Sequence, residues 1–377
     1  MHNPILDVED EWHVIQSLLP EGWLQAAKTL KAFLRVRYLP SAGDLLRLLL
    51  FHAISDNGLR LSVAQASISG IAHMSQVALF KRLKKSSDWL AWIANQLCNA
   101  FRNGSINAHG LRLRAVDSTT VQGPASKGTE WRVHYALDLE TLSCDWFELT
   151  DEHGAELLER TPVKEGDLII ADRNYLRYNG VKATTTAGGD VLVRLKWKHT
   201  CMTDLNGQEF HALDYAKKLK VAEVGEWKVV LRDGKNPKSE GINSRVIITK
   251  LPKEAIEKAE RKKLRQCQKK GVKNTNQKTI EAVQYIMLFT TLPETKMNAS
   301  GILELYRYRW QVELAFKRHK QLLKLGQLPH KDPQAARGWI QAKLVVVLIL
   351  ETLHRNARCF SPWGFNTENL KHTSISH

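Results

Sequence analysis

The sequence has few cysteines, and none of them lies in a pattern that binds a metal or builds a disulfide framework. The 377 residues include five cysteines, which are widely scattered and of which no two form a C-x-x-C pair. Disulfide-rich scaffolds and zinc sites are therefore not indicated, and a reducing compartment is expected.

Long hydrophobic runs are also missing. The longest one, Leu344–Leu350, is far too short to cross a bilayer. The N-terminus, MHNPILDVEDEW, is acidic and has no apolar region of the signal-peptide kind. The sequence predicts a soluble cytoplasmic protein with no membrane partner.

Acidic residues are scarce relative to basic ones. The chain has 39 Asp and Glu against 55 Lys and Arg, which gives a net charge of +16 and a pI of about 9.6. Such an excess favours a polyanionic partner, nucleic acid before a membrane surface. The alternative is that the charge only confers solubility. The apolar fraction of 43% and the 11 tryptophans indicate a folded chain with room for two or three domains.

Residues 1–105 are predicted to form an all-α domain. Apolar residues recur at three- and four-residue spacing in DLLRLLLFHAI and SDWLAWIANQLCNAF. Between these segments we expect a helix, a turn at Gly70 and a second helix capped by Ser75, whose basic end includes Lys81 and Arg82. This pattern fits a DNA-reading helix-turn-helix and a plain helical bundle equally well.

Residues 106–199 change to a strand pattern. LRLRAVD, WRVHYALDL and DWFEL predict three strands, followed by a short helical piece at GAELLER and a buried strand at DLIIAD. A helix and the strand VLVRLKW come next. This order is that of a ribonuclease-H-like α/β core.

Residues 200–283 are predicted to interrupt that core as a β-rich insertion. Two strands precede the basic segment KEAIEKAERKKLRQCQKKGVKNTNQK, where Glu254 lies four residues before Lys258 and favours a helix. Its cations outnumber its acids about three to one, which favours contact with phosphates over a merely solvated helix. Residues 284–360 return to the core with the strand YIMLFTTLP and helices, and residues 361–377 are expected to be irregular.

The segment YRYRWQVELAFKRHK predicts a continuous helix with an unusual polar stripe. At 100° per residue five side chains share an arc of about 80°: Tyr306, Arg309, Glu313, Lys317 and Lys320. Apolar side chains border this arc on both sides, as expected if the stripe faces a polyanion or a metal in a groove. An internal ion-pair ladder through Glu313 is the alternative.

Two further carboxylates follow predicted strands. Asp117 closes LRLRAVD and Asp172 closes DLIIAD. A single Asp at such a place is more often a turn residue than a ligand. Two of them at the ends of neighbouring strands, together with Glu313, suit Mg²⁺, which prefers carboxylate oxygens. Two such ions support in-line phosphoryl transfer.

In these motifs the chain resembles the DDE transposases of the bacterial insertion-sequence-four family. That family's third-acid signature, Y-(2)-R-(3)-E-(6)-K, is matched by the stripe described above, with Lys317 at a further basic position. The motif D-R-x-Y is matched by Asp172, Arg173 and Tyr175. VDSTTV resembles the strand of the first acid, and VLVRLK resembles the next core strand, with Arg194 at its basic position.

The resemblance implies a cut-and-paste transposase with a ribonuclease-H-like core and a helical DNA-binding domain. Asp117, Asp172 and Glu313 would be catalytic and would hold two Mg²⁺ ions, for which Mn²⁺ can substitute. The enzyme would nick a transposon end, form and reopen a hairpin, and join the end to target DNA. Its partners would be double-stranded DNA, at the terminal inverted repeats and the target, and a second copy of the chain in a homodimer.

The resemblance also implies DNA contacts around a flipped base. Tyr306, Arg309 and Lys320 would contact the phosphate beside that base. The other predicted DNA contacts are Lys317, Arg173 and Arg194, and Lys81 and Arg82 of the N-terminal helices. Relatives place a stacking Trp just before the last core strand. Here Ile286 occupies the matching position beside Tyr285, so Tyr285 and Trp197 are the candidates for this role.

Two other functions remain open on the sequence. A ribonuclease-H-like nuclease that only hydrolyses DNA would share the three acids but would not need the Tyr/Arg/Lys stripe. A regulator derived from a transposase would bind DNA through the N-terminal helices alone and would gain nothing from acids that face phosphates.

Overall fold

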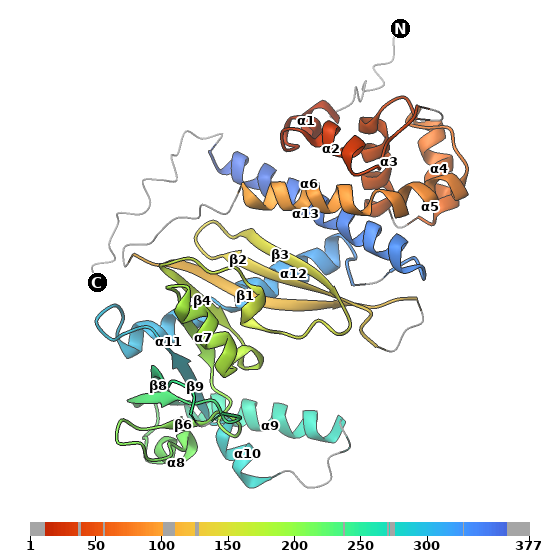
Figure 1. Ribbon diagram of the computed structural model, residues 1–377. Helices are drawn as coiled ribbons and strands as arrows, with labels where there is room; N and C mark the ends of the chain where they lie inside the picture. Colours follow the sequence, from red (N-terminus) through yellow and green to blue (C-terminus); the bar gives the residue numbers. More distant parts are fainter. Residues whose placement is uncertain are drawn as a thin grey trace.

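The computed structural model describes residues 12–36, 39–55, 57–100, 110–124, 128–236, 238–269, 271, 276–326 and 328–359 (Figure 1). The acidic start of the chain, the boundary predicted at residue 105 and the tail predicted to be irregular lie outside these residues. None of the helices described is long and apolar enough to span a membrane.

The N-terminal part of the described chain is helical, as predicted. Its helices are α1 (Trp12–Ser17), α2 (Trp23–Thr29), α3 (Ala42–Ile54), α4 (Leu59–Ile68), α5 (Gln76–Lys85) and α6 (Ser87–Asn99). Between α4 and α5, Gly70 has a φ of 68°, which glycine adopts without steric cost. The Ser75 hydroxyl then accepts a hydrogen bond from the Ala78 N–H and caps α5. The predicted helix–turn–helix outline is confirmed; its role in DNA reading stays a prediction.

The middle of the chain builds a nine-stranded sheet in the order β3-β2-β1-β4-β5-β9-β8-β7-β6. The strands are β1 (Arg112–Val121), β2 (Trp131–Asp138), β3 (Ser143–Asp151), β4 (Asp167–Ala171), β5 (Asp190–Arg194), β6 (Met202–Thr203), β7 (Val224–Leu231), β8 (Ile242–Lys250) and β9 (Tyr285–Thr290). β1 to β3 form an antiparallel meander, and β4 and β5 run parallel to β1. The predicted order of core strands is confirmed.

The strands of the predicted insertion continue the core sheet. β9 pairs with β5 on one side and with β8 on the other, and β7 and β6 follow β8. Because β9 connects the two sets of strands, the hydrogen-bonded ladder runs unbroken from the core into the insertion. The domain boundaries given above stay predictions.

Helices cover both faces of this sheet (Figure 1). They are α7 (Tyr178–Thr186), α8 (Ala212–Ala216), α9 (Lys253–Lys269), α10 (Gln277–Ala282), α11 (Ala299–Arg307), α12 (Trp310–Leu322) and α13 (Pro333–Cys359), with the 3₁₀ helices η1 (Leu158–Arg160) and η2 (Arg173–Tyr175). Successive strand residues point to opposite faces. Ala115 and Ile170 therefore face the helices α11 to α13, whereas Val116 and Ala171 face α7.

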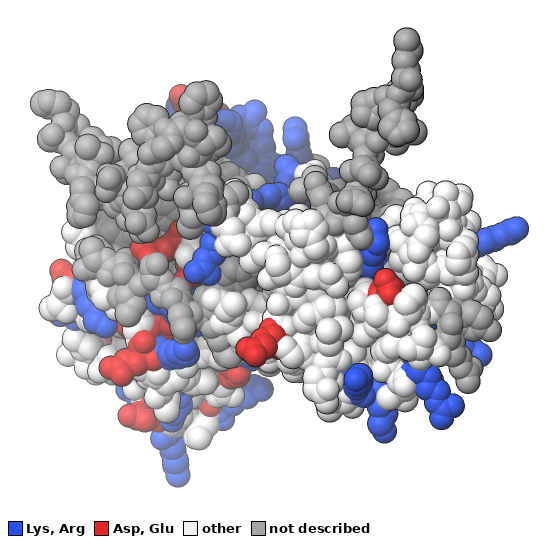
Figure 2. All heavy atoms as spheres, turned by 90° about the horizontal axis from the view of Figure 1, so that it is seen from above, with Lys and Arg blue, Asp and Glu red and all other residues white. Residues whose placement is uncertain are grey.

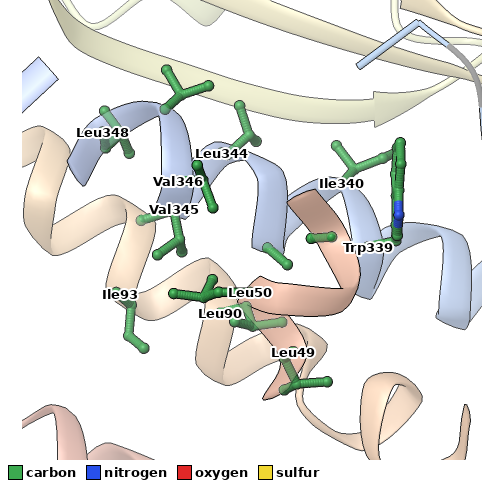
Figure 3. Close-up of a cluster of buried hydrophobic side chains, with 14 of the residues drawn as sticks. Leu49, Leu50, Leu90, Ile93, Trp339, Ile340, Leu344, Val345, Val346 and Leu348 are labelled. Atoms are coloured by element: carbon green, nitrogen blue, oxygen red, sulfur yellow. The ribbon is translucent and has the colours of Figure 1, made fainter. Parts of the chain in front are cut away.

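A large hydrophobic core joins the N-terminal helices to α13, which lies between them and the sheet (Figure 3). Leu50 of α3 and Leu90 of α6 lie on the side of α13 from which Val345 points, and each of the three is at most 5% exposed. Leu344 points from the opposite side of α13 toward the sheet. Gly338 permits the close crossing of α13 over α5, because a Cβ there would stand 2.5 Å from the Leu83 carbonyl oxygen. The N-terminal helices thus share their core with α12, α13 and the β1–β3 meander.

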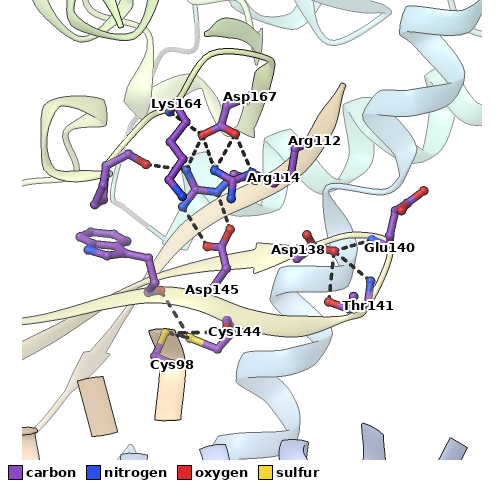
Figure 4. A network of polar contacts seen from close by, with 12 residues as sticks. Cys98, Arg112, Arg114, Asp138, Glu140, Thr141, Cys144, Asp145, Lys164 and Asp167 are labelled. Carbon is purple, nitrogen blue, oxygen red and sulfur yellow. Dashed lines mark hydrogen bonds and ion pairs between the residues drawn. The ribbon is translucent and has the colours of Figure 1, made fainter. Parts of the chain in front are cut away.

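A buried ionic network ties the start of the parallel strands to β3 (Figure 4). The Arg114 guanidinium donates to Asp145 of β3 at 2.5 and 2.8 Å and to Asp167 of β4 at 3.0 Å. Arg112 donates to the same Asp167 at 2.6 and 2.8 Å. Two guanidinium groups balance two carboxylates, so the charges are compensated where water is excluded.

Candidate active site

Asp117 and Asp172 lie side by side at the carboxyl ends of the parallel pair β1 and β4. The last paired residues of this ladder, Val116 and Ala171, come directly before them. Arg194 of β5 extends the same row, one position beyond the last β4–β5 pair. Neighbouring strands are about 4.8 Å apart, so two carboxylates and one guanidinium start from adjoining positions. By alternation, all three point to the face covered by α11 and α12.

β1 does not end at Asp117, which corrects the prediction from the sequence. The strand continues to Val121, because Ser118 and the residues after it pair with β2. Asp117 lies just beyond the β1–β4 ladder, but it is still paired with β2. The backbone that bears its carboxylate is therefore held by this pairing with β2.

Helices α11 and α12 bring the third acid to this face of the sheet. The Tyr306 hydroxyl donates to the carbonyl oxygen of Ala171, the residue before Asp172, at 3.3 Å. The Arg309 guanidinium lies 5.8 Å from the centre of the Tyr306 ring, and its Nη2 donates to Glu313 Oε1 at 2.6 Å. Tyr306 thus fixes the end of α11 against β4, and Arg309 joins α11 to the carboxylate of α12.

The predicted continuous helix over YRYRWQVELAFKRHK is wrong. α11 ends at Arg307 and α12 begins at Trp310. At the junction the N–H groups of Tyr308 and Arg309 bond to carbonyls three residues back, at 3.0 and 3.2 Å. This spacing tightens the turn, so the arc of a straight helix does not describe the stripe.

Of the ion-pair ladder considered as the alternative, only the pair between Arg309 and Glu313 is present among the residues that the structure describes. Glu313 pairs with Arg309, and within the described residues no ion pair joins it to Lys317, which is exposed. A single surface pair of this kind contributes at most about 1 kcal/mol. Stability alone is therefore a weak reason for this arrangement.

Among the acids of the site, Asp117 has the most strongly shifted pKa. Burial raises its pKa to about 6, and the charges of Glu156 and Glu313 act in the same direction. The Ser118 N–H, which donates to Asp117 Oδ1 at 2.8 Å, and the Arg309 guanidinium oppose the rise. A buried acid among other carboxylates is typical of a functional site.

Glu156 is a fourth carboxylate at this place, which the sequence reasoning missed. It lies in the loop after β3 and accepts a hydrogen bond from the Ser118 hydroxyl at 2.9 Å. Arg132 of β2 pairs with the same oxygen at 3.2 Å. No motif or periodicity marks this residue, because an irregular loop has no spacing to interpret.

The residues fit a hard divalent cation by donor type and by charge. Carboxylate oxygens are the ligands that Mg²⁺ takes in proteins. The pKa of Asp117 is raised chiefly because burial disfavours its charged form, and a bound cation would stabilise that charge. No three His, Cys, Asp or Glu side chains in the described part of the chain are gathered closely enough to hold a metal. Glu313 is turned toward Arg309 and is 54% exposed, so its side chain has room to rotate.

A basic groove of about 530 Å³ opens on the β5 side of the acids. Its polar and aromatic lining includes Arg173, Arg194, Lys262, Lys263, Trp197 and Tyr285. Burial, and then the neighbouring Arg173, lower the pKa of Arg194. A guanidinium held among cations in this way favours the approach of an anion.

The two aromatic candidates for base stacking differ in their access to this groove. Trp197 is partly exposed, with Lys198 Nζ 5.3 Å from the centre of its ring. Tyr285 is only 3% exposed and lies beneath Lys250. The ring of Trp197 is therefore accessible to a base in this groove, whereas the ring of Tyr285 is buried.

A second groove, of about 550 Å³, lies on the β1 side. Its lining includes Thr120 of β1, Gln122 directly after β1, Lys320 of α12 and Lys324. Basic grooves therefore flank the acids on both sides, with Lys320 in one and Arg194 in the other. Of the predicted DNA contacts, Lys320 thus lines one groove, and Arg173, Arg194 and Tyr285 line the other.

The structure does not bring Lys81 and Arg82 of α5 into either groove. Arg82 donates to the Ala32 carbonyl oxygen at 3.3 Å and covers the Phe33 ring, whereas Lys81 is exposed. On the face seen in Figure 2, Lys and Arg side chains gather at the upper centre of the view and are otherwise dispersed. Any DNA contact of α5 would be separate from the acid site.

Comparison with known proteins agrees with this arrangement. A family model described as "Transposase DDE domain" matches residues 108–349, which include Asp117, Asp172 and Glu313. The chain belongs to this family. The resemblance to DDE transposases predicted from the sequence is confirmed at that level.

Curated relatives support the same assignment. The chain is 31% identical over 363 residues to the putative transposase InsL for insertion sequence element IS186A of Escherichia coli (strain K12), covering 95% of this chain and 98% of the relative. It is 31% identical over 364 residues to the transposase for insertion sequence element IS421 of Escherichia coli, with the same coverage. The transposase for IS231B of Bacillus thuringiensis subsp. berliner is 22% identical over 338 residues, 78% of this chain and 68% of that protein.

Proposed function

We propose that this protein is the transposase of an insertion sequence, of the insertion-sequence-four type, and that it cuts and rejoins DNA by phosphoryl transfer. The observation that supports this proposal most strongly is that Asp117 and Asp172 lie at adjoining strand ends, beneath the helix that bears Glu313. The relatives named as transposases for insertion sequence elements support the substrate class.

In this proposal the three acids bind divalent cations, two Mg²⁺ ions by preference, with Mn²⁺ able to replace them. When bound, such ions activate a water or 3′-hydroxyl and stabilise the leaving oxygen. Glu313 leaves its pair with Arg309 to join Asp117 and Asp172. Arg309, freed from that pair, is then available to a DNA phosphate beside the acids.

The flanking grooves define a path for the DNA across the strand ends. Lys320 contacts the backbone on the β1 side, and Arg173 and Arg194 contact it on the β5 side. Tyr306 and Lys317 complete the phosphate contacts along α11 and α12. We assign the stacking of a displaced base to Trp197, whose ring surface is exposed in the basic groove. Base stacking on an aromatic ring contributes about 1–3 kcal/mol.

The reaction proposed is end nicking, formation and opening of a hairpin, and joining to target DNA, carried out by a homodimer that pairs two ends. A nuclease that only hydrolyses is the second candidate, because the acids alone would suffice for it. A regulator that binds DNA without cutting it is the third.

The test is cleavage of a DNA fragment that carries this gene with its native flanks, in Mg²⁺ or in EDTA. Denaturing gels separate nicked strands from hairpins. Metal-dependent cuts at both flanks with hairpin ends would support the transposase. Cuts without hairpins would favour the nuclease, and binding without cuts in Mg²⁺ would reject both enzymes.

A further inference from the structure

We propose that helix α9 is a DNA-backbone-binding helix that holds the duplex beside the cut position. Its binding face, named here the α9 stripe, consists of Lys258, Lys262, Arg265 and Lys269. This inference rests on the proposed function, because it assumes DNA at the acid site. It adds a binding surface outside that site and names the partner's chemistry, a duplex phosphate backbone.

The sequence places the cations of α9 on one face. At 100° per residue, the four members of the α9 stripe fall within an arc of about 60°. Glu257 and Glu260 point about 140° or more away from Lys262. From Lys258 to Lys269 the stripe extends over about 17 Å at 1.5 Å per residue. One DNA strand carries a phosphate per 3.4 Å of axis, so this length matches about five phosphates.

The contacts of α9 engage Glu257 and Glu260 and leave the stripe unpaired. Glu260 Oε1 accepts a hydrogen bond from the Gln284 side chain at 2.9 Å, and Glu257 pairs with Arg261 at 3.6 Å. Across the part of the chain that the structure describes, no ion pair or hydrogen bond involves a stripe side chain. The acids therefore do not neutralise the stripe.

α9 also has little other reason to be ordered. None of its 17 residues is buried, whereas most helical stability in proteins comes from packing of an apolar face. From Lys258 to Lys269 the charged residues of this face are all basic, and Glu254 shares their direction one turn earlier. A solvated charged helix, the alternative, would need no such run of one sign. A ligand that binds only the folded helix would stabilise it, and a polyanion has the matching charge.

The position of α9 connects the stripe to the acid site. Lys262 belongs to the stripe and also lines the basic groove that contains Arg173 and Arg194. Arg173 directly follows Asp172. In Figure 1, α9 extends outward from the sheet near β6 and α10. DNA that leaves the acids through the groove therefore meets the stripe next.

The test measures duplex binding in EDTA, where cleavage is suppressed, as a function of salt. The probe is a labelled duplex of a native gene flank, and fluorescence anisotropy gives the dissociation constant at each KCl concentration. Each phosphate neutralised contributes about 0.9 to the slope of log K against log salt. The variant Lys258→Gln/Lys262→Gln/Arg265→Gln/Lys269→Gln should therefore lower the slope by about 3 to 4. Arg265→Gln alone should lower it by about 1.

The matched control removes the same charge from exposed lysines elsewhere in the sheet region. It is Lys182→Gln/Lys218→Gln/Lys220→Gln/Lys228→Gln, and none of these residues lines either groove. We expect this variant to change the slope by less than about 1. Thermal unfolding of both variants verifies that they fold.

The proposal is overturned if the stripe variant keeps the wild-type slope, or if both variants lower the slope equally, because net charge alone would then explain the effect. Its failure is separable from that of the proposed function. If the wild-type protein never cuts DNA in Mg²⁺ but the stripe variant has a lower salt slope, the proposed enzymatic function is rejected and DNA binding by the α9 stripe is supported. If the wild-type protein cuts DNA and the stripe variant keeps the wild-type salt slope, the enzymatic function is supported and DNA binding by the α9 stripe is rejected.

Discussion

At the scale of single residues, Asp117 shows how a functional site costs the fold stability. Folding raises the pKa of this carboxyl from an ordinary value near 4 to about 6, chiefly by burial. The unfolded chain then loses its proton at lower pH than the folded chain does. Stability from this group is therefore present below about pH 4 and is lost as the pH rises through 6.

We predict that Asp117→Asn abolishes DNA cleavage and yet stabilises the protein at high pH. In EDTA at pH 8 the free energy of unfolding should rise by about 1–2 kcal/mol, less than the full 1.36 kcal/mol per pKa unit because some solvent reaches the site. At pH 4 the part of this difference in the free energy of unfolding that comes from titration of Asp117 should vanish. Urea unfolding at both pH values measures this, and an Asn variant less stable than wild type at pH 8 would contradict it.

The residue types of the site were predictable from the sequence, but their number was not. Asp117, Asp172 and Glu313 are marked by strands, by a helix and by cations at fixed spacing. Glu156 lies in a loop, and only the fold reveals that its charge acts on Asp117. The burial of Tyr285 was also hidden, because it depends on how the insertion packs on β9.

At the scale of elements, strand identity followed from the sequence and strand pairing did not. The alternating and apolar segments gave β1 to β5 and β7 to β9 in the right order. The extension of β1 beyond Asp117 depends on pairing with β2, and the joining of β8 to β9 depends on contacts distant in sequence. Local periodicity contains neither kind of information.

The break between α11 and α12 had no local signal either. Neither glycine nor proline occurs from Tyr306 to Lys320, so helix propensity predicted continuity. The Tyr306 hydroxyl holds α11 against β4, while Val312 and Phe316 bury α12 in the core shared with α13. These two tertiary attachments set separate positions for the helices, and the tight turn accommodates both.

The buried network of β1, β3 and β4 predicts a large stability effect. Arg114→Met leaves Asp145 without its guanidinium partner inside the protein, so the free energy of unfolding should fall by about 3–5 kcal/mol. Arg261→Gln, which removes an exposed pair with Glu257, should change it by less than about 0.5 kcal/mol. Chemical denaturation compares the two, and equal effects would show that the network is not structural.

At the scale of the whole molecule, one core connects both ends of the described chain. Helices α3 and α6 pack on α13, which packs on the sheet. The sequence suggested an N-terminal domain with its own core, since amphipathic patterns show which face is apolar but not its partner. The same core includes Val312 and Phe316 of α12, the helix that bears Glu313.

A buried histidine pair in this body predicts an acid sensitivity. His52 of α3 lies 3.2 Å from His330, between ring Nε2 atoms, and burial lowers its pKa to about 4, with His330 and Lys343 acting in the same direction. The unfolded chain therefore takes up a proton first as the pH falls below about 6.5. Stability should fall between pH 6.5 and 4, by up to about 3 kcal/mol for this group.

Thermal unfolding from pH 7.5 to 4.5 tests this expectation with two variants. His52→Gln should flatten the loss of stability toward acid pH, whereas His199→Gln, at an exposed position, should leave it as in wild type. An unchanged acid slope in His52→Gln would exclude the pair as its source.

The most direct test of the central claim, that three acids on β1, β4 and α12 carry out DNA cleavage, is the single-turnover cutting rate in Mg²⁺. The substrate is the native gene flank, and the variants are Asp117→Asn, Asp172→Asn and Glu313→Gln. Glu304→Gln, on the exposed side of α11, is the matched control. Loss of a cation-holding acid should slow cutting by about a thousandfold or more, since charge stabilisation by the metal is worth several kcal/mol and each 1.36 kcal/mol is tenfold. We predict this loss in all three acid variants and a near wild-type rate in the control. An acid variant that cuts within about tenfold of wild type would contradict it.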